Sequence, residues 1–191
     1  MAWPKIINRS TTQVSSWMDV IEREVQFKPG AATESYHAVA QPDYIAIVAC
    51  TPDGMIPIVR QYRPALECFT WELPAGMVDE GETPIDCCRR ELLEETGLPA
   101  RTVHALGRYA PCTARLSNRI HSFFVEAGLR DGPTVAEPGI ELKLVTPQEL
   151  GTLILAGEFV LQLHIGALLL AAMRGHLEFS AFRQKGAGKL E

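Results

Sequence analysis

The chain has 191 residues, of which 47% are hydrophobic, and its formal net charge is −5. This length suits one folded domain with a short appendage, and the apolar fraction is sufficient for a well-buried core. The acidic balance and the lack of any lysine-rich or arginine-rich run argue against a nucleic-acid-binding protein.

The cysteine pattern and the apolar segments predict the cellular setting. The five cysteines have spacings that resemble neither a zinc site nor a disulfide framework, so a reducing cytoplasm is expected. Met1 to Ser10 has no apolar stretch long enough for a signal peptide. The most apolar run, Phe159 to Met173, is interrupted by Gln162 and His164 and is shorter than the roughly 20 residues of a membrane-spanning helix. We therefore expect a buried helix there and no membrane association.

The first 40 residues form a separate N-terminal segment in the predicted domain plan. Val20 to Phe27 partly alternates between apolar and polar residues, which is typical of a strand. Trp3, Trp17 and Phe27 need burial, either against the main domain or in a second subunit.

The pattern becomes clearer from Tyr44 onwards. Tyr44 to Cys50 and Met55 to Gln61 are apolar runs separated by Thr51 to Gly54, a turn with proline second and glycine fourth, so a β-hairpin is predicted. Pro57 predicts that the second strand has an edge or a bulge at that point. Phe69 to Leu73 is predicted to be a further short strand.

A loop followed by a helix is predicted between Gly76 and Leu98. Thr83-Pro84 is a helix start, with proline where its missing N–H costs nothing, and Gly97 is a helix end. An apolar stripe on this helix is expected to pack on a sheet and consists of Ile85, Cys88 and Leu92.

Three carboxylates project from the opposite face of this helix. With Glu91 as reference, Glu95 lies about 40° to one side and Glu94 about 60° to the other. Like charges on one helix face repel one another, and hard oxygen ligands suit Mg²⁺ or Mn²⁺. From these residues alone, a divalent cation site and a solvated acidic face are both compatible with the pattern.

The remainder of the chain alternates strands with two helices. The predicted elements are strands at 102–109, 120–126 and 141–145, a helix that begins after the N-cap Thr146 and reaches Leu155, and a last helix at about 159–174. Residues 110–119 and 131–139 are predicted loops, and the tail from 184 to 191 is expected to be disordered. Irregularly alternating strands and helices indicate an α/β fold with a mixed sheet covered by helices.

The stretch Gly76–Leu98 fits the pattern G-x5-E-x7-R-E-U-x-E-E-x-G-U, in which U is a bulky aliphatic residue, without a mismatch. The chain therefore resembles the Nudix hydrolases, and this stretch resembles their Nudix box. The resemblance implies an α/β/α sandwich over residues 41–183, following the N-terminal β-rich segment. It also implies a pyrophosphohydrolase with Mg²⁺ as cofactor, Mn²⁺ being the alternative.

The resemblance also implies roles for the box residues. Glu91 and Glu95 would be the main metal ligands, with Glu94 and the backbone carbonyl of Ala75 as further ligands. Glu82 and Arg90 would instead support the site by an ion pair that ties the loop to the helix.

Upstream residues resemble the ADP-ribose pyrophosphatase branch of this family, in the stretches 61–65 and 71–76. This branch implies ADP-ribose or a related nucleoside diphosphate sugar as substrate, and a homodimer formed through the N-terminal segment. The substrate contacts expected on this basis are Arg63 and Arg119, with Trp17 and Phe27 stacking on the base.

The general base and the substrate stay open at this point. Glu137, in a predicted loop, Glu141, at the start of a strand, and Glu94 are the candidates for the base. GDP- or UDP-sugars and dinucleoside polyphosphates are alternative substrates, and a non-catalytic regulator that binds nucleotide sugars is the alternative class.

Overall fold

The computed structural model describes residues 3–130 and 139–182, and these fall into two compact units. The first unit contains the chain up to Asp43 together with Tyr109–Ile120, and the second contains the other described residues. The structure thus groups a segment from the middle of the chain with the N-terminal one. The predicted tail, 184–191, lies outside the described residues.

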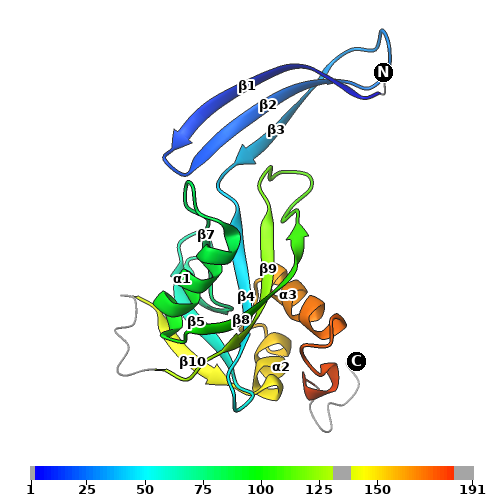
Figure 1. Cartoon of the computed structure of the whole chain (residues 1–191). Coiled ribbons are helices and arrows are strands. Elements are labelled where there is room, and N and C mark those ends of the chain that lie inside the picture. The colour runs from blue at the N-terminus through cyan, green and yellow to red at the C-terminus, as the bar shows by residue number, and fades with distance from the viewer. Residues whose placement is uncertain (1–2, 131–138, 183–191) are drawn as a thin grey trace. The chain divides into compact units, whose positions relative to one another are not determined.

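The first unit is built on three antiparallel strands in the order β1-β2-β3 (Figure 1). These are β1 (Lys5–Ser15), β2 (Met18–Gln26) and β3 (Glu34–Ala40). The segment 109–120 pairs with the free edge of β3 at one residue, Val39. There the N–H of Val39 donates to the carbonyl of Arg115 over 2.7 Å, and the N–H of Ser117 donates to the carbonyl of Val39 over 3.0 Å.

The second unit contains two sheets. One has the order β7-β4-β9-β8 and the other the order β10-β5-β6. Their strands are β4 (Tyr44–Cys50), β5 (Ile56–Arg63), β6 (Cys68–Glu72), β7 (Ala75–Met77), β8 (Ala100–Tyr109), β9 (Ile120–Ala127) and β10 (Glu141–Val145).

The predicted hairpin of β4 and β5 is therefore only half right. The turn is present, with the N–H of Gly54 donating to the carbonyl of Thr51, but the strands it joins belong to different sheets. Both edges of β4 are already paired, with β7 and β9, so β5 pairs with β6 and β10 instead. Pro57 faces Leu144 of β10, and the pairing with β6 starts only at Val59, so no ladder bond is lost on that side.

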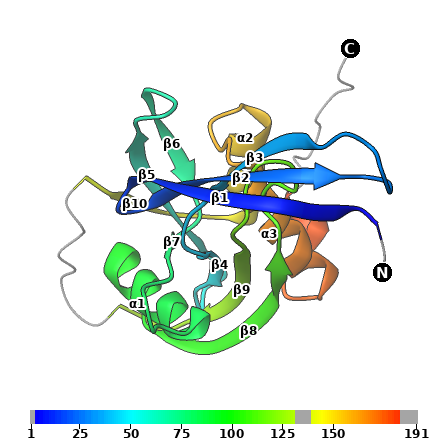
Figure 2. The same cartoon turned by 90° about the horizontal axis from the view of Figure 1, so that it is seen from above.

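Three α-helices belong to the second unit: α1 (Pro84–Thr96), α2 (Pro147–Leu155) and α3 (Gln162–Met173), followed by the short 3₁₀ helix η1 (Phe179–Phe182). Figures 1 and 2 show α1 to one side of β4 and α3 to the other. Residues Ile45 to Ala49 of β4 are all fully buried, as expected for a strand covered on both faces. The α/β sandwich predicted from the sequence is confirmed.

Helix α1 has the predicted ends. The Thr83 hydroxyl accepts a hydrogen bond from the N–H of Asp86, and Gly97 ends the helix with a φ of 68° in the left-handed region. The capping box of α2 is also present, because Thr146 and Glu149 each bond the backbone N–H of the other. No helix among the described residues is long and apolar enough to cross a membrane.

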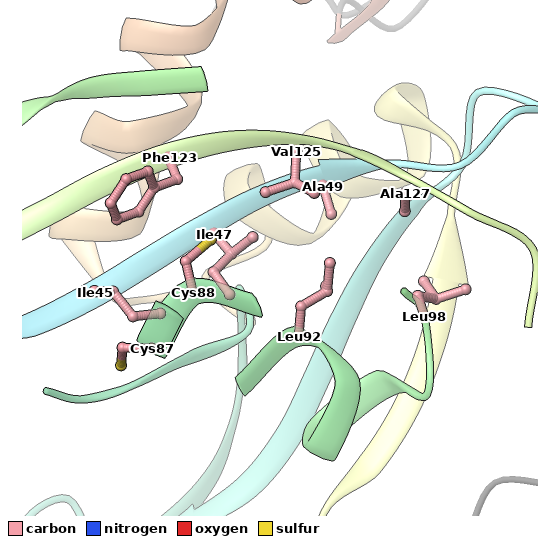
Figure 3. Packing of buried hydrophobic residues seen from close by; sticks show 10 residues of the cluster. All are labelled: Ile45, Ile47, Ala49, Cys87, Cys88, Leu92, Leu98, Phe123, Val125 and Ala127. Atoms are coloured by element: carbon pink, nitrogen blue, oxygen red, sulfur yellow. The ribbon is translucent and has the colours of Figure 1, made fainter. Parts of the chain in front are cut away.

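The packing of α1 on its sheet differs in one residue from the apolar stripe predicted for this helix (Figure 3). Cys88 and Leu92 are fully buried against Ile47 and its neighbours, but Ile85 is 38% exposed and Cys87 is buried instead. The Cys87 thiol donates to the carbonyl of Met77 over 3.3 Å, because the loop before the helix folds over this face. Burial raises the pKa of both thiols, to about 12 for Cys88, so they act as packing groups.

Candidate active site

Glu91 and Glu95 of α1 both reach the backbone of β7. The N–H of Ala75 donates to Oε2 of Glu95 over 3.0 Å, and the Glu95 side chain is only 4% exposed. The Glu91 carboxylate lies against Gly76, since a Cβ atom added at Gly76 would be 1.9 Å from Oε1 of Glu91. One helical turn separates the two glutamates, and Gly76 makes room for the Glu91 carboxylate because it has no side chain.

Arg90 ties the loop to the helix. Its Nε and Nη2 donate to the two carboxylate oxygens of Glu82, each over 2.9 Å, and Nη1 donates to Glu91 over 2.8 Å and to Glu94 over 3.0 Å. Nη2 also donates to the carbonyl of Met77 over 3.3 Å. The hydrogen bonds from Arg90 lower the pKa of Glu82 to about 2, so this carboxylate stays charged near neutral pH.

The donor set fits a hard divalent cation in its chemistry. Glu91, Glu94 and Glu95 supply carboxylate oxygens, which suit Mg²⁺ or Mn²⁺. Glu95 accepts from the N–H of Ala75 in β7, and Glu91 and Glu94 accept from Arg90. Among residues 3–130 and 139–182, no three acidic, histidine or cysteine side chains already surround a common point. Glu91 and Glu94 instead share Nη1 of Arg90 as their hydrogen-bond donor.

Arg63 is held by a buried carboxylate that sequence reasoning did not single out. Its Nε donates to Oε1 of Glu72 over 2.7 Å, a second bond joins Nη2 to Oε2, and the hydroxyl of Thr70 donates to Glu72 over 2.6 Å. Glu72 is 2% exposed, and although burial opposes it, hydrogen bonds from Arg63 and Thr70 lower the pKa of its carboxyl. A charged residue two positions after Thr70, and therefore on the same face of β6, was the available signal.

His164 is a second buried polar group beside this pair. The N–H of Leu73 donates to its Nδ1 over 3.0 Å, and burial lowers the pKa of His164 to about 4. The imidazole is therefore neutral near pH 7 and satisfies a backbone group at the end of β6.

This histidine makes stability depend on pH. An unfolded chain takes up the proton below about pH 6.5, whereas folded His164 stays neutral down to about pH 4. Stability contributed by the neutral imidazole is present above pH 6.5 and is lost between pH 6.5 and 4, by up to about 1.4 kcal/mol per pH unit. We expect urea unfolding to show this slope in the wild type and a flatter one in His164→Asn, which keeps an acceptor but has no proton to gain. Equal slopes would contradict the assignment.

The structure describes two of the three candidates for the general base, Glu94 and Glu141. Glu94 is half-exposed on α1 beside Arg90. Glu141 begins β10 and forms an ion pair of 3.3 Å with Arg60, its register partner on β5. Glu137 lies outside the described residues. Their catalytic roles stay predictions.

The remaining predicted substrate contacts belong to the first unit. Trp17 is 60% exposed in the turn between β1 and β2, and Phe27 is 43% exposed and packs edge-to-face on Tyr36 at 6.0 Å between ring centres. Arg119 donates through Nη1 to the carbonyls of Ser117 and Asn118 in its own loop. None of these three side chains is fully buried, and their contacts with substrate stay predictions.

Comparison with known proteins places the chain in a family. A family model of the NUDIX domain matches residues 40–161. The CMP-5'-(N-acetyl-N-hydroxy-3-aminopropyl)phosphonate hydrolase of Streptomyces rubellomurinus is 31% identical over 133 residues, which are 69% of this chain and 65% of that protein. The ADP-ribose pyrophosphatase of Bacillus subtilis is 31% identical over 109 residues, or 57% of this chain and 58% of that protein.

These matches span less than two thirds of the length of either relative. A crystal structure of an ADP compounds hydrolase matches with a TM-score of 0.76 and 19% identity, over 96% of this chain and 98% of that one, which shows a shared fold. The family model covers more than half of the chain, and the chain therefore belongs to the Nudix family.

Proposed function

We propose that this protein hydrolyses the pyrophosphate bond of ADP-ribose or a related nucleoside diphosphate sugar, with Mg²⁺ as cofactor and Mn²⁺ as its substitute. The products would be AMP, or another nucleoside monophosphate, and a sugar phosphate. The observation that carries the proposal is that Glu91 and Glu95 both lie against the backbone of Ala75–Gly76. The loop that follows is held to α1 by the ion pair of Arg90 with Glu82.

The metal would be held by Glu91, Glu94 and Glu95, with the carbonyl of Ala75 as a further ligand. Bound there, a divalent ion neutralises phosphate oxygens and assists the attack of water. Glu82 and Arg90 keep the loop and the helix in place, so that the carboxylates do not have to be ordered by the substrate.

Other residues would orient the substrate and receive the proton of the attacking water. The Arg63 guanidinium, already oriented by Glu72, suits phosphate oxygens through the N–H groups that face away from that carboxylate. The base is a glutamate, and we keep Glu137, Glu141 and Glu94 as the three candidates.

We also propose a homodimer formed through the N-terminal unit. Large apolar side chains are exposed along its strands and turns, among them Ile6, Ile7, Val14, Trp17 and Phe27. A second copy that covers them would bury apolar area and bring Trp17 or Phe27 near a nucleobase. The cysteine pattern supports a reducing, cytoplasmic setting for the protein.

A substrate panel tests the proposal. Purified protein with Mg²⁺ would be offered ADP-ribose, GDP- and UDP-sugars, a dinucleoside polyphosphate and a CMP-linked phosphonate, and phosphate would be read after a coupled phosphatase. We expect the highest kcat/KM for ADP-ribose or another nucleoside diphosphate sugar. Binding of these compounds without release of a monophosphate would instead favour a non-catalytic nucleotide-sugar sensor.

Gly76→Ala tests the position of Glu91 without changing its charge. The new methyl group would occupy the place of the Glu91 carboxylate, and a misplacement of about 1 Å costs on the order of 10²-fold in turnover. The displaced group is the end of a flexible side chain, so stability should change by less than about 1 kcal/mol. The control is Gly81→Ala, where φ is 82° and no atom lies within 4 Å of the added carbon, so its cost is backbone strain alone. An unchanged kcat in Gly76→Ala would refute a role for this contact.

A further inference from the structure

A hollow of about 370 Å³ lies within the first unit, between its sheet and the segment 110–119. Three arginines line it: Arg23 from the central strand β2, and Arg115 and Arg119 from the segment. Thr113 and Ser117 belong to the same lining, and the Ser117 hydroxyl already donates to the carbonyl of Val39 over 3.3 Å. The hollow is therefore lined mainly by arginine side chains and small residues.

Small side chains account for the space. Ala38 of β3 lies opposite Ile21, two positions from the pair of Tyr36 and Arg23, so Ala38 and Arg23 are on the same face of the sheet. Ala110 and Ala114 form other parts of the lining. A larger residue at Ala38 would project into the volume that the arginines surround.

Hydrogen bonds hold the backbone of the segment 110–119 in place at both Arg115 and Arg119. The carbonyl of Arg115 accepts from Val39 over 2.7 Å, and the N–H of Arg119 donates to Asp43 over 2.7 Å. Between them, buried Asn118 donates through Nδ2 to the carbonyl of Pro42 over 3.0 Å. The backbone that carries the two arginines is therefore fixed before any ligand arrives, which reduces the ordering cost of binding.

Positive charge in this hollow is not balanced by an ion pair. Within the two described ranges, no carboxylate forms a salt bridge with Arg23, Arg115 or Arg119. Arg119 uses Nη1 for two carbonyls of its own loop, at 3.2 and 3.0 Å, and a guanidinium has five N–H donors in all. Like charges around one hollow repel one another, and an anion placed among them would relieve that repulsion.

We propose that Arg23, Arg115 and Arg119 form a binding pocket for the phosphoryl group of a small molecule. A guanidinium group donates to two phosphate oxygens at once, and three arginines offer several such donors. The phosphoryl group belongs either to the substrate of the proposed hydrolysis or to a separate phosphorylated effector, and the two sources have the same chemistry. The pocket itself does not depend on the proposed hydrolytic activity.

The test is calorimetric titration of the whole protein with pyrophosphate in the presence of EDTA, so that no divalent metal contributes. We expect the wild type to bind, and Arg115→Ala and Arg119→Ala each to weaken the affinity about tenfold or more, since each removes charge-assisted hydrogen bonds. Arg115→Lys keeps the charge and loses the paired donors, so it should fall between the wild type and Arg115→Ala.

Two controls separate this pocket from general charge effects and from the Nudix box. Lys28→Ala removes one positive charge from an exposed turn of the same unit, outside the hollow, and should bind as the wild type does. Glu95→Gln should also bind pyrophosphate normally, even if it abolishes turnover. Thermal unfolding of every variant checks that the fold is intact, and Arg115 is exposed, so its replacement leaves the core unchanged.

Steady-state kinetics then identifies the source of the phosphoryl group. A raised KM with unchanged kcat in Arg115→Ala assigns the pocket to the substrate, and unchanged kinetics with lost pyrophosphate binding assigns it to an effector. Failure of the wild type to bind pyrophosphate, or equal affinities in the wild type and all arginine variants, would overturn the proposal.

Discussion

Glu95→Gln is expected to reduce metal-dependent turnover by about 10²- to 10³-fold, because a carboxylate that holds a catalytic cation contributes several kcal/mol to transition-state stabilisation. Glutamine has nearly the same shape, and its side-chain oxygen still accepts the hydrogen bond from the N–H of Ala75. The fold should therefore persist while the affinity for Mg²⁺ falls. Release of AMP from ADP-ribose as a function of Mg²⁺ concentration measures both effects.

Glu80→Gln is the matched control for this variant. Glu80 lies in the loop that precedes α1, is exposed, and is not one of the specified positions of the Nudix box. Glu80→Gln removes one negative charge, as Glu95→Gln does, so a general electrostatic effect on an anionic substrate would appear equally in both variants. Wild-type turnover in Glu95→Gln would refute the proposed metal site.

Arg63→Met is expected to destabilise the protein by about 2–3 kcal/mol. This cost is larger than that of replacing Glu72, the other member of the ion pair, because the buried carboxylate loses its charged partner. The replacement leaves the Glu72 carboxylate buried, with the Thr70 hydroxyl still donating a hydrogen bond to it. Glu72→Gln should cost less, on the order of 1 kcal/mol, because the half-exposed Arg63 left behind can be hydrated. Urea unfolding at pH 7 measures both values.

The pH dependence of the same variants gives an independent check. Once Arg63 is absent, burial raises the pKa of Glu72 and the carboxyl takes up a proton more readily. The stability difference between Arg63→Met and the wild type should therefore shrink as the pH falls from 7 to 5. The double variant Arg63→Met/Glu72→Leu should be more stable than Arg63→Met alone. Equal costs for the two single variants would show that burial of Glu72 does not control the energetics of this pair.

Local features of the chain were predictable because their causes are local. Thr83-Pro84 and Gly97 set the ends of α1, and Thr146 with Glu149 begins α2, since capping depends on residues within one turn of the helix end. The box spacing likewise indicated that Glu91, Glu94 and Glu95 share a helix face. Neighbouring residues determine these geometries whatever the rest of the chain does.

Long-range pairings were not predictable in the same way. Whether β5 pairs with β4 depends on which edges of β4 other strands already occupy. Cys87 is buried because the chain before α1 folds back over that side of the helix, which helical periodicity does not record. The bond from Leu73 to His164 joins residues 91 positions apart. Periodicity records which side of an element is apolar, but it does not record which segment will cover that side.

The sequence by itself determined the ends of α1, the start of α2, the α/β class and the shared face of the three box carboxylates, because these follow from local geometry and from the pattern of apolar residues. Only the tertiary structure placed Glu91 against Gly76, set Arg63 on the buried Glu72, and joined segment 109–120 to β3 so that Arg115 and Arg119 line one hollow with Arg23. Those placements depend on contacts between residues that are distant in sequence, and such contacts are chosen by the packing of the whole unit.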